Sequence, residues 1–130
     1  MSNLQKTNLK KKIIELREST GMNRKEFCDY FGIPYRTVTE WERDNRHAPE
    51  YLIRLLEYYI RAEKVISYIK NRFSYGERVA VFSHHGFLEY LIPTALGVKP
   101  HIFRFSLDNV SVTVVEFCRD GNTVLRYVNK

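Results

Sequence analysis

The stretch GMNRKEFCDYFGIPYRTVTEWERDNRHAP, residues 21–49, decides the fold of the first half of this chain. Asn23 is a favourable helix N-cap, and Glu26 stands three residues later, as in a capping box. Gly32 interrupts the helix that begins there. Pro34 suits the first turn of the next helix, because its missing N–H is not needed at that position. The spacing therefore predicts two short helices joined by a tight turn.

Apolar side chains at helical spacing predict how these helices pack. The side chains expected to meet between them are Phe27, Phe31, Ile33, Val38 and Trp41. Helical periodicity continues on both sides, over residues 10–19 and from Pro49 to about Phe73. We expect an all-α helix-turn-helix bundle of four helices over residues 9–62, with residues 1–8 as a disordered tail.

The character of the sequence changes after about residue 61. RVAVF at 78–82 is a short β-branched run that predicts a buried strand, and GFLEYLIPTALG at 86–97 predicts a helix. FRFSL, SVTVVEF and TVLRYV are typical of strands, and a turn containing Asp120 and Gly121 joins the last two. Helices followed by strand-rich sequence predict an α+β chain, in which residues 63–130 form a partial α/β unit with a small mixed sheet.

Composition limits the classes of protein that remain. The 130 residues carry a formal net charge of +6, which weakly favours a polyanionic partner such as nucleic acid. No apolar run approaches the roughly 20 residues of a membrane span, and we see no secretory signal. We expect a cytoplasmic protein with no membrane partner. Cys28 and Cys118 lie in apolar patterns and predict free thiols; we expect no metal site and no cofactor.

The helix expected at about 34–43 has an outer face of long or hydrogen-bonding side chains, which suits a DNA major groove. With two flanking arginines positioned for phosphates, the candidate DNA-binding residues are Arg24, Tyr35, Arg36, Thr39, Arg43 and Arg46. Arg36 is the best candidate for base readout, because arginine can pair bidentately with guanine.

Residues of about 9–60 resemble the Cro/lambda-repressor-like helix-turn-helix family. The matching positions are Phe27, Cys28, Gly32, Ile33, Thr37, Val38, Trp41 and Glu42. Arg24 and Asp44 depart from the pattern, which often has Gln and Gly there. The resemblance implies a sequence-specific transcriptional regulator that binds double-stranded DNA as a homodimer.

Residues of about 61–130 resemble the C-terminal part of the histidine phosphatase (phosphoglycerate mutase-like) superfamily. The resemblance rests on VAVFSHHG, LIPTALGV, FRFSLDNVSVTVVEF and TVLRYVN. It assigns the family's second active-site histidine to His84, puts His85 where glycine is usual, and matches Asn109 to a common asparagine. It also implies a small phosphorylated ligand near His84.

The same family carries its nucleophilic histidine in an Arg-His-Gly signature, which this sequence lacks. Without the nucleophile most of the rate advantage is lost, so we expect no enzyme activity. The C-terminal segment would then serve dimerisation or effector binding. Two alternatives stay open: a phosphatase-family protein acting on a small phosphoester through His84, and a non-functional fusion.

Overall fold

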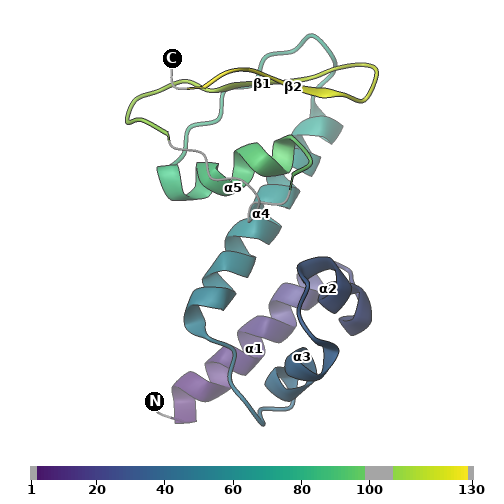
Figure 1. Cartoon of the computed structure of the whole chain (residues 1–130), viewed down its shortest axis with the longest axis vertical. Helices are drawn as coiled ribbons and strands as arrows, with labels where there is room; N and C mark the ends of the chain where they lie inside the picture. The colour runs from purple at the N-terminus through teal and green to yellow at the C-terminus, as the bar shows by residue number, and fades with distance from the viewer. Residues whose placement is uncertain (1–2, 99–106, 129–130) are drawn as a thin grey trace. The chain divides into compact units, whose positions relative to one another are not determined.

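The structure is a computed structural model that describes residues 3–98 and 107–128. These residues form five helices and two strands, shown in Figure 1. The chain divides into two compact units, residues 1–60 (unit 1) and residues 61–130 (unit 2).

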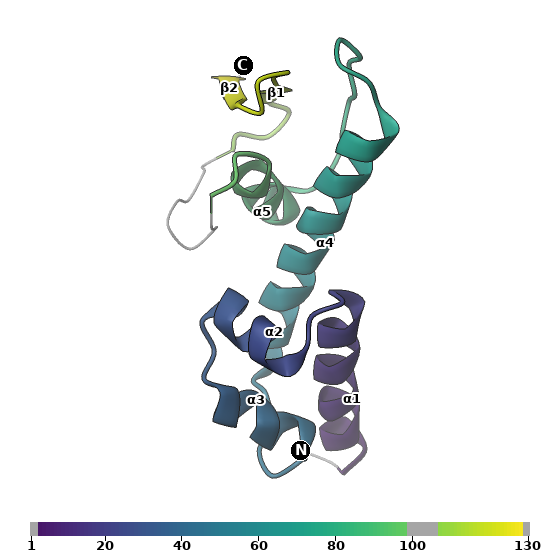
Figure 2. The ribbon, with the colours of Figure 1, turned by 90° about the vertical axis from the view of Figure 1, so that its right-hand side faces the viewer.

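Unit 1 is helical throughout its regular structure. It contains α1 (Asn3–Ser19), α2 (Arg24–Phe31), α3 (Tyr35–Glu42) and the first turns of α4 (Glu50–Arg72). In Figure 2, α3 lies beside α1 and α2, and it contacts both. One expectation fails at the N-terminus, since α1 begins at Asn3, inside the range 1–8 that we expected to be a disordered tail.

Local signals fix the ends of α2. The capping box is confirmed, because the Asn23 side chain accepts from the backbone N–H of Glu26 and the Glu26 side chain accepts from that of Asn23. Gly32 ends the helix in the left-handed conformation, with φ 66°, which costs glycine nothing. Pro34 then takes the N-cap position of α3.

The core of unit 1 joins all four helices and includes the one tryptophan of the chain. Its buried residues are Leu9, Ile13, Phe27, Cys28, Val38, Trp41, Ala48, Ile53, Leu56 and Ile60. Phe31 and Ile33, also expected between the helices, pack against this cluster while partly exposed. The apolar spacing read from the sequence therefore identifies this core.

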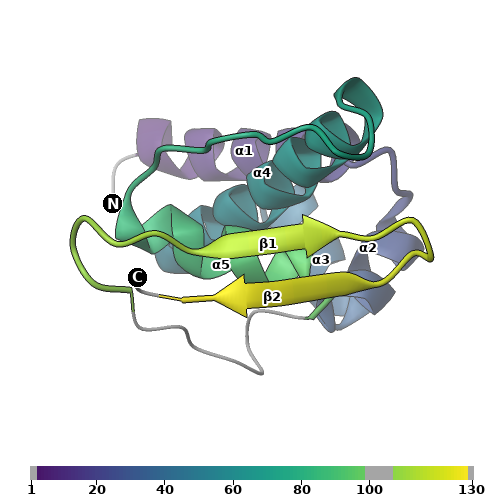
Figure 3. The same ribbon diagram turned by 90° about the horizontal axis from the view of Figure 1, so that it is seen from above.

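Unit 2 contains the end of α4, then α5 (His85–Ala95), β1 (Val114–Phe117) and β2 (Thr123–Tyr127). The two strands form an antiparallel hairpin that lies over α5 in Figure 3. A small core lies between these elements and consists of Ala62, Ile66, Phe87, Leu91 and Ala95, with Val115 and Phe117 packed against it.

The sheet differs from the one expected. In the described part of the chain it has two antiparallel strands and is not mixed. Residues 78–82, expected as a buried strand, form no strand and are exposed, with Phe82 95% accessible. Strand propensity takes effect only when a neighbouring strand pairs and packs, and no described residue does this for 78–82. Most of the FRFSL run, at 103–107, lies outside the described residues.

Two further findings concern the whole described chain. Cys28 is buried and Cys118 is partly buried, and both are free thiols, as expected. None of the described helices is both long and apolar enough to span a membrane.

Candidate functional site

The candidate site is the N-terminal end of α5, where the sequence reads Ser-His-His-Gly. His84 is the N-cap residue, with extended backbone angles, and its carbonyl oxygen accepts from the N–H groups of Phe87 and Leu88. The N–H groups of His85 and Gly86 come before the first residue that donates a hydrogen bond within the helix, so they have no partner inside it. They lie at the positive end of the helix dipole, a favourable environment for an anion.

The two neighbouring histidines have different surroundings. The imidazole of His84 makes no capping hydrogen bond and the residue is exposed. The imidazole of His85 lies between two acceptors: Nδ1 is 3.2 Å from the carbonyl oxygen of Leu107, and Nε2 is 3.1 Å from Oε1 of Glu89. His84 is therefore the histidine of the pair whose ring is open to a ligand.

The contact between His85 and Leu107 brings a second segment to this end of α5. Residues 107–111 form a turn in which the Ser111 hydroxyl donates to the carbonyl oxygen of Asp108, at 2.7 Å. Asn109 lies in this turn and is exposed. The site thus consists of His84, the first turn of α5, and a polar turn held near it.

The six residues proposed to contact DNA lie on or beside α3, but not all of them are available. Arg24 donates through Nε to Oε2 of Glu42 at 3.0 Å and through Nη1 to the Tyr35 hydroxyl at 3.4 Å. The Thr39 hydroxyl donates to the carbonyl oxygen of Tyr35 within the helix. Arg36, Arg43 and Arg46 are exposed.

Glu42 links Arg24 to α1 in an ion triad. Its second oxygen accepts from Nε of Arg17 at 2.7 Å, and the Glu42 side chain is only 4% exposed. Burial alone would raise the pKa of Glu42, but the hydrogen bonds from Arg17 and Arg24 outweigh burial and hold that pKa below its usual range. The residue that we matched to the helix-turn-helix pattern thus stabilises unit 1.

His47 is a residue for which the sequence predicted no role. Its Nδ1 is buried and lies 3.4 Å from Oδ1 of Asp44, without hydrogen-bond geometry to any described group. The sequence does hint at His47, because Arg46-His47-Ala48 differs at one position from the Arg-His-Gly signature of the family's nucleophile. It follows α3 in a loop, however, whereas the family's signature lies on a strand.

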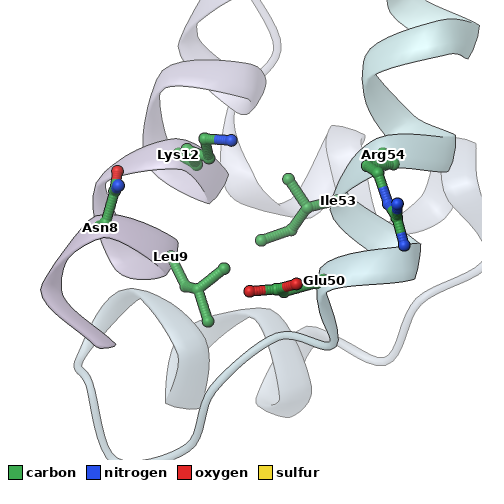
Figure 4. Close-up of a pocket in the computed structure, with 6 residues that line it drawn as sticks. All are labelled: Asn8, Leu9, Lys12, Glu50, Ile53 and Arg54. Carbon is green, nitrogen blue, oxygen red and sulfur yellow. The ribbon is translucent and has the colours of Figure 1, made fainter. Parts of the chain in front are cut away.

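A cavity of about 200 Å³ opens in unit 1 between α1 and the start of α4. Figure 4 shows its lining, which combines two apolar side chains with polar and charged ones: Asn8, Leu9, Lys12, Glu50, Ile53 and Arg54. None of these six is a histidine, cysteine or serine. Among the described residues, no cluster of three or more histidine, cysteine or acidic side chains could hold a metal ion.

A comparison with protein-family models identifies the class. Residues 11–130 match the model of the histidine phosphatase superfamily, branch 1, so the chain belongs to that superfamily. Neither curated proteins nor solved structures gave a match. The resemblance seen in residues 61–130 therefore holds and extends much further towards the N-terminus.

The same match corrects our main functional prediction. It begins at residue 11 and takes in residues 21–49, which we had assigned to a DNA-binding domain; no comparison supports a helix-turn-helix family. The interpretation as a sequence-specific transcriptional regulator is wrong. The structure supplies a physical reason why the pattern misled, because Trp41 and Glu42 serve the core and the ion triad of unit 1.

Proposed function

We propose that this protein binds a small phosphoester at the N-terminal end of α5, with His84 as the side chain that contacts the phosphoryl group. Membership of the histidine phosphatase superfamily carries the proposal. The exposed His84 ring supports it, beside N–H groups of the first helical turn that have no partner among the described residues. A protonated imidazole and backbone N–H groups are suitable donors for phosphate oxygens.

We further propose that binding is not followed by efficient hydrolysis. A covalent route requires an activated nucleophile, and the sequence has no Arg-His-Gly signature to supply one. The protein would then act as a binding member of a family of enzymes. A phosphatase with a substitute nucleophile is the competing candidate.

The binding test uses the full chain and inorganic phosphate. Titration followed by ¹H–¹⁵N NMR should shift the amide signals of residues 84–88 in a saturable manner, and His84→Ala should weaken binding at least tenfold. His47→Ala is the matched control and should leave the affinity unchanged. Unchanged amide signals at the start of α5, or equal affinity in His84→Ala, would refute phosphate binding at this site.

The hydrolysis test uses p-nitrophenyl phosphate as a generic phosphoester. We expect release of p-nitrophenol no faster than in buffer. Release that exceeds buffer and is lost in His84→Ala would establish the phosphatase alternative instead.

A further inference from the structure

His85, the residue that stands where the family usually has glycine, connects two segments that are 22 residues apart in the sequence. Its ring spans from the first turn of α5 to the carbonyl oxygen of Leu107, while its other nitrogen contacts Glu89 one helical turn further along. Carbonyl and carboxylate oxygens only accept hydrogen bonds. Both ring nitrogens therefore face protein acceptors, and neither points to a ligand.

The turn attached to His85 needs such a restraint. Val110 has φ 59°, a left-handed backbone conformation that is rare for a β-branched residue, and its side chain is fully exposed. No packing of the Val110 side chain compensates for this strain, so hydrogen bonds in the turn must do so. The hydrogen bonds of this segment include the bond from Ser111 to Asp108 and the contact from His85 to Leu107.

We propose that His85 is a positioning residue, which fixes the turn 107–111 against the first turn of α5 and so sets the distance between Asn109 and His84. This inference rests on the proposed phosphoester binding. An exposed asparagine amide is a suitable donor to a phosphate oxygen. His84 and Asn109 then form two sides of the binding site, and His85 contributes through the turn and not by direct contact.

The test compares two variants of the full chain. His85→Gly installs the residue usual in the family and removes both contacts. Glu89→Gln keeps an oxygen acceptor for Nε2 and leaves the Leu107 contact intact, so it is the matched control. A third variant, His85→Gln, restores one side-chain N–H donor and tests for rescue.

Two measurements are needed, and the first requires no ligand. Hydrogen exchange of the amides of residues 107–111 should become faster in His85→Gly and stay unchanged in Glu89→Gln. In the second, the dissociation constant for inorganic phosphate should rise about tenfold in His85→Gly, the scale of one lost charge-assisted contact. It should recover in part in His85→Gln and change less than twofold in Glu89→Gln.

The outcomes separate the two proposals. Unchanged exchange of residues 107–111 in His85→Gly overturns the positioning role, and so does equal or tighter phosphate binding by that variant. A wild-type chain that does not bind phosphate refutes the proposed function, whereas the exchange measurement still decides whether His85 fixes the turn.

Discussion

The two units bury their apolar side chains to different extents. Among the described residues, the core cluster of unit 1 has ten buried members and that of unit 2 has five, with a two-stranded sheet as its cover. Isolated two-stranded hairpins are marginal in water and need packing against a helix. The comparison indicates that unit 1 is stabilised by a complete core of its own, whereas unit 2 depends on a few contacts between α4, α5 and the hairpin.

The largest effect is expected in the centre of unit 1. Phe27 is fully buried, so Phe27→Ala should lower the free energy of unfolding by about 3–5 kcal/mol, through lost transfer energy and the cavity left behind. Trp41, the single tryptophan, lies in the same core and provides the fluorescence signal for denaturant unfolding. Tyr51→Ala, at a position that is 62% exposed, is the control and should change the midpoint little. Equal changes in the free energy of unfolding from the two substitutions would contradict the burial of Phe27 in this core.

The ion triad should produce the next largest effect. Glu42→Gln leaves two partly buried arginines without their carboxylate, which should cost about 2 kcal/mol after allowance for their partial exposure. The exposed pair of Lys25 and Asp29 provides the control, since Asp29→Asn should cost less than about 0.5 kcal/mol.

The same triad gives unit 1 a defined dependence on pH. The pKa of Glu42 is lower in the folded chain than its usual value, so the stabilisation is complete above the usual carboxyl pKa. It is lost as the pH falls from there through the folded-state pKa. Trp41 fluorescence in urea, measured across this acidic range, should show a smaller loss of stability in Glu42→Gln than in the wild type. Parallel pH profiles would contradict the triad's contribution.

A loss similar to that of the ion triad, and smaller than that at Phe27, is expected from the core of unit 2. Leu91 is buried in α5 against a cluster half the size of the other, so Leu91→Ala should cost about 2 kcal/mol, the lower end for such truncations. Hydrogen exchange of the α5 amides reports this loss directly. A cost as large as that of Phe27→Ala would mean that the two cores are equally well packed.

The smallest effect should occur at Phe82. This side chain is almost fully accessible, and exposed positions usually change stability by less than about 0.5 kcal/mol, so Phe82→Ser should leave α5 exchange unchanged. A loss of 1 kcal/mol or more would show that residues 78–82 pack in solution. That result would reduce the contrast between the units.

Features set by neighbouring residues were predictable from the sequence. The capping box of Asn23 and Glu26, the break at Gly32 and the core positions of unit 1 all depend on spacing within a few residues. The sequence likewise predicted that a helix follows His84, and α5 begins at His85.

Features that depend on distant residues were not predictable. Residues 78–82 have strand propensity, but propensity does not supply the neighbouring strand that would pair with them. The contact of His85 with Leu107 joins residues that are 22 positions apart, and no short-range sequence pattern predicts such a pairing. Local helical spacing also led to the wrong function for residues 21–49, because packed helices of many families share that spacing.

Because Cys28 is buried, the rate at which its thiol reacts with a reagent reports how often the core of unit 1 opens to solvent. Burial raises the pKa of the Cys28 thiol and removes it from reagents, while Cys118, next to the hairpin turn, is partly accessible. A maleimide should therefore attach rapidly at Cys118 and only slowly at Cys28. The rate of the slow labelling at Cys28 would then measure local opening of the core without any denaturant.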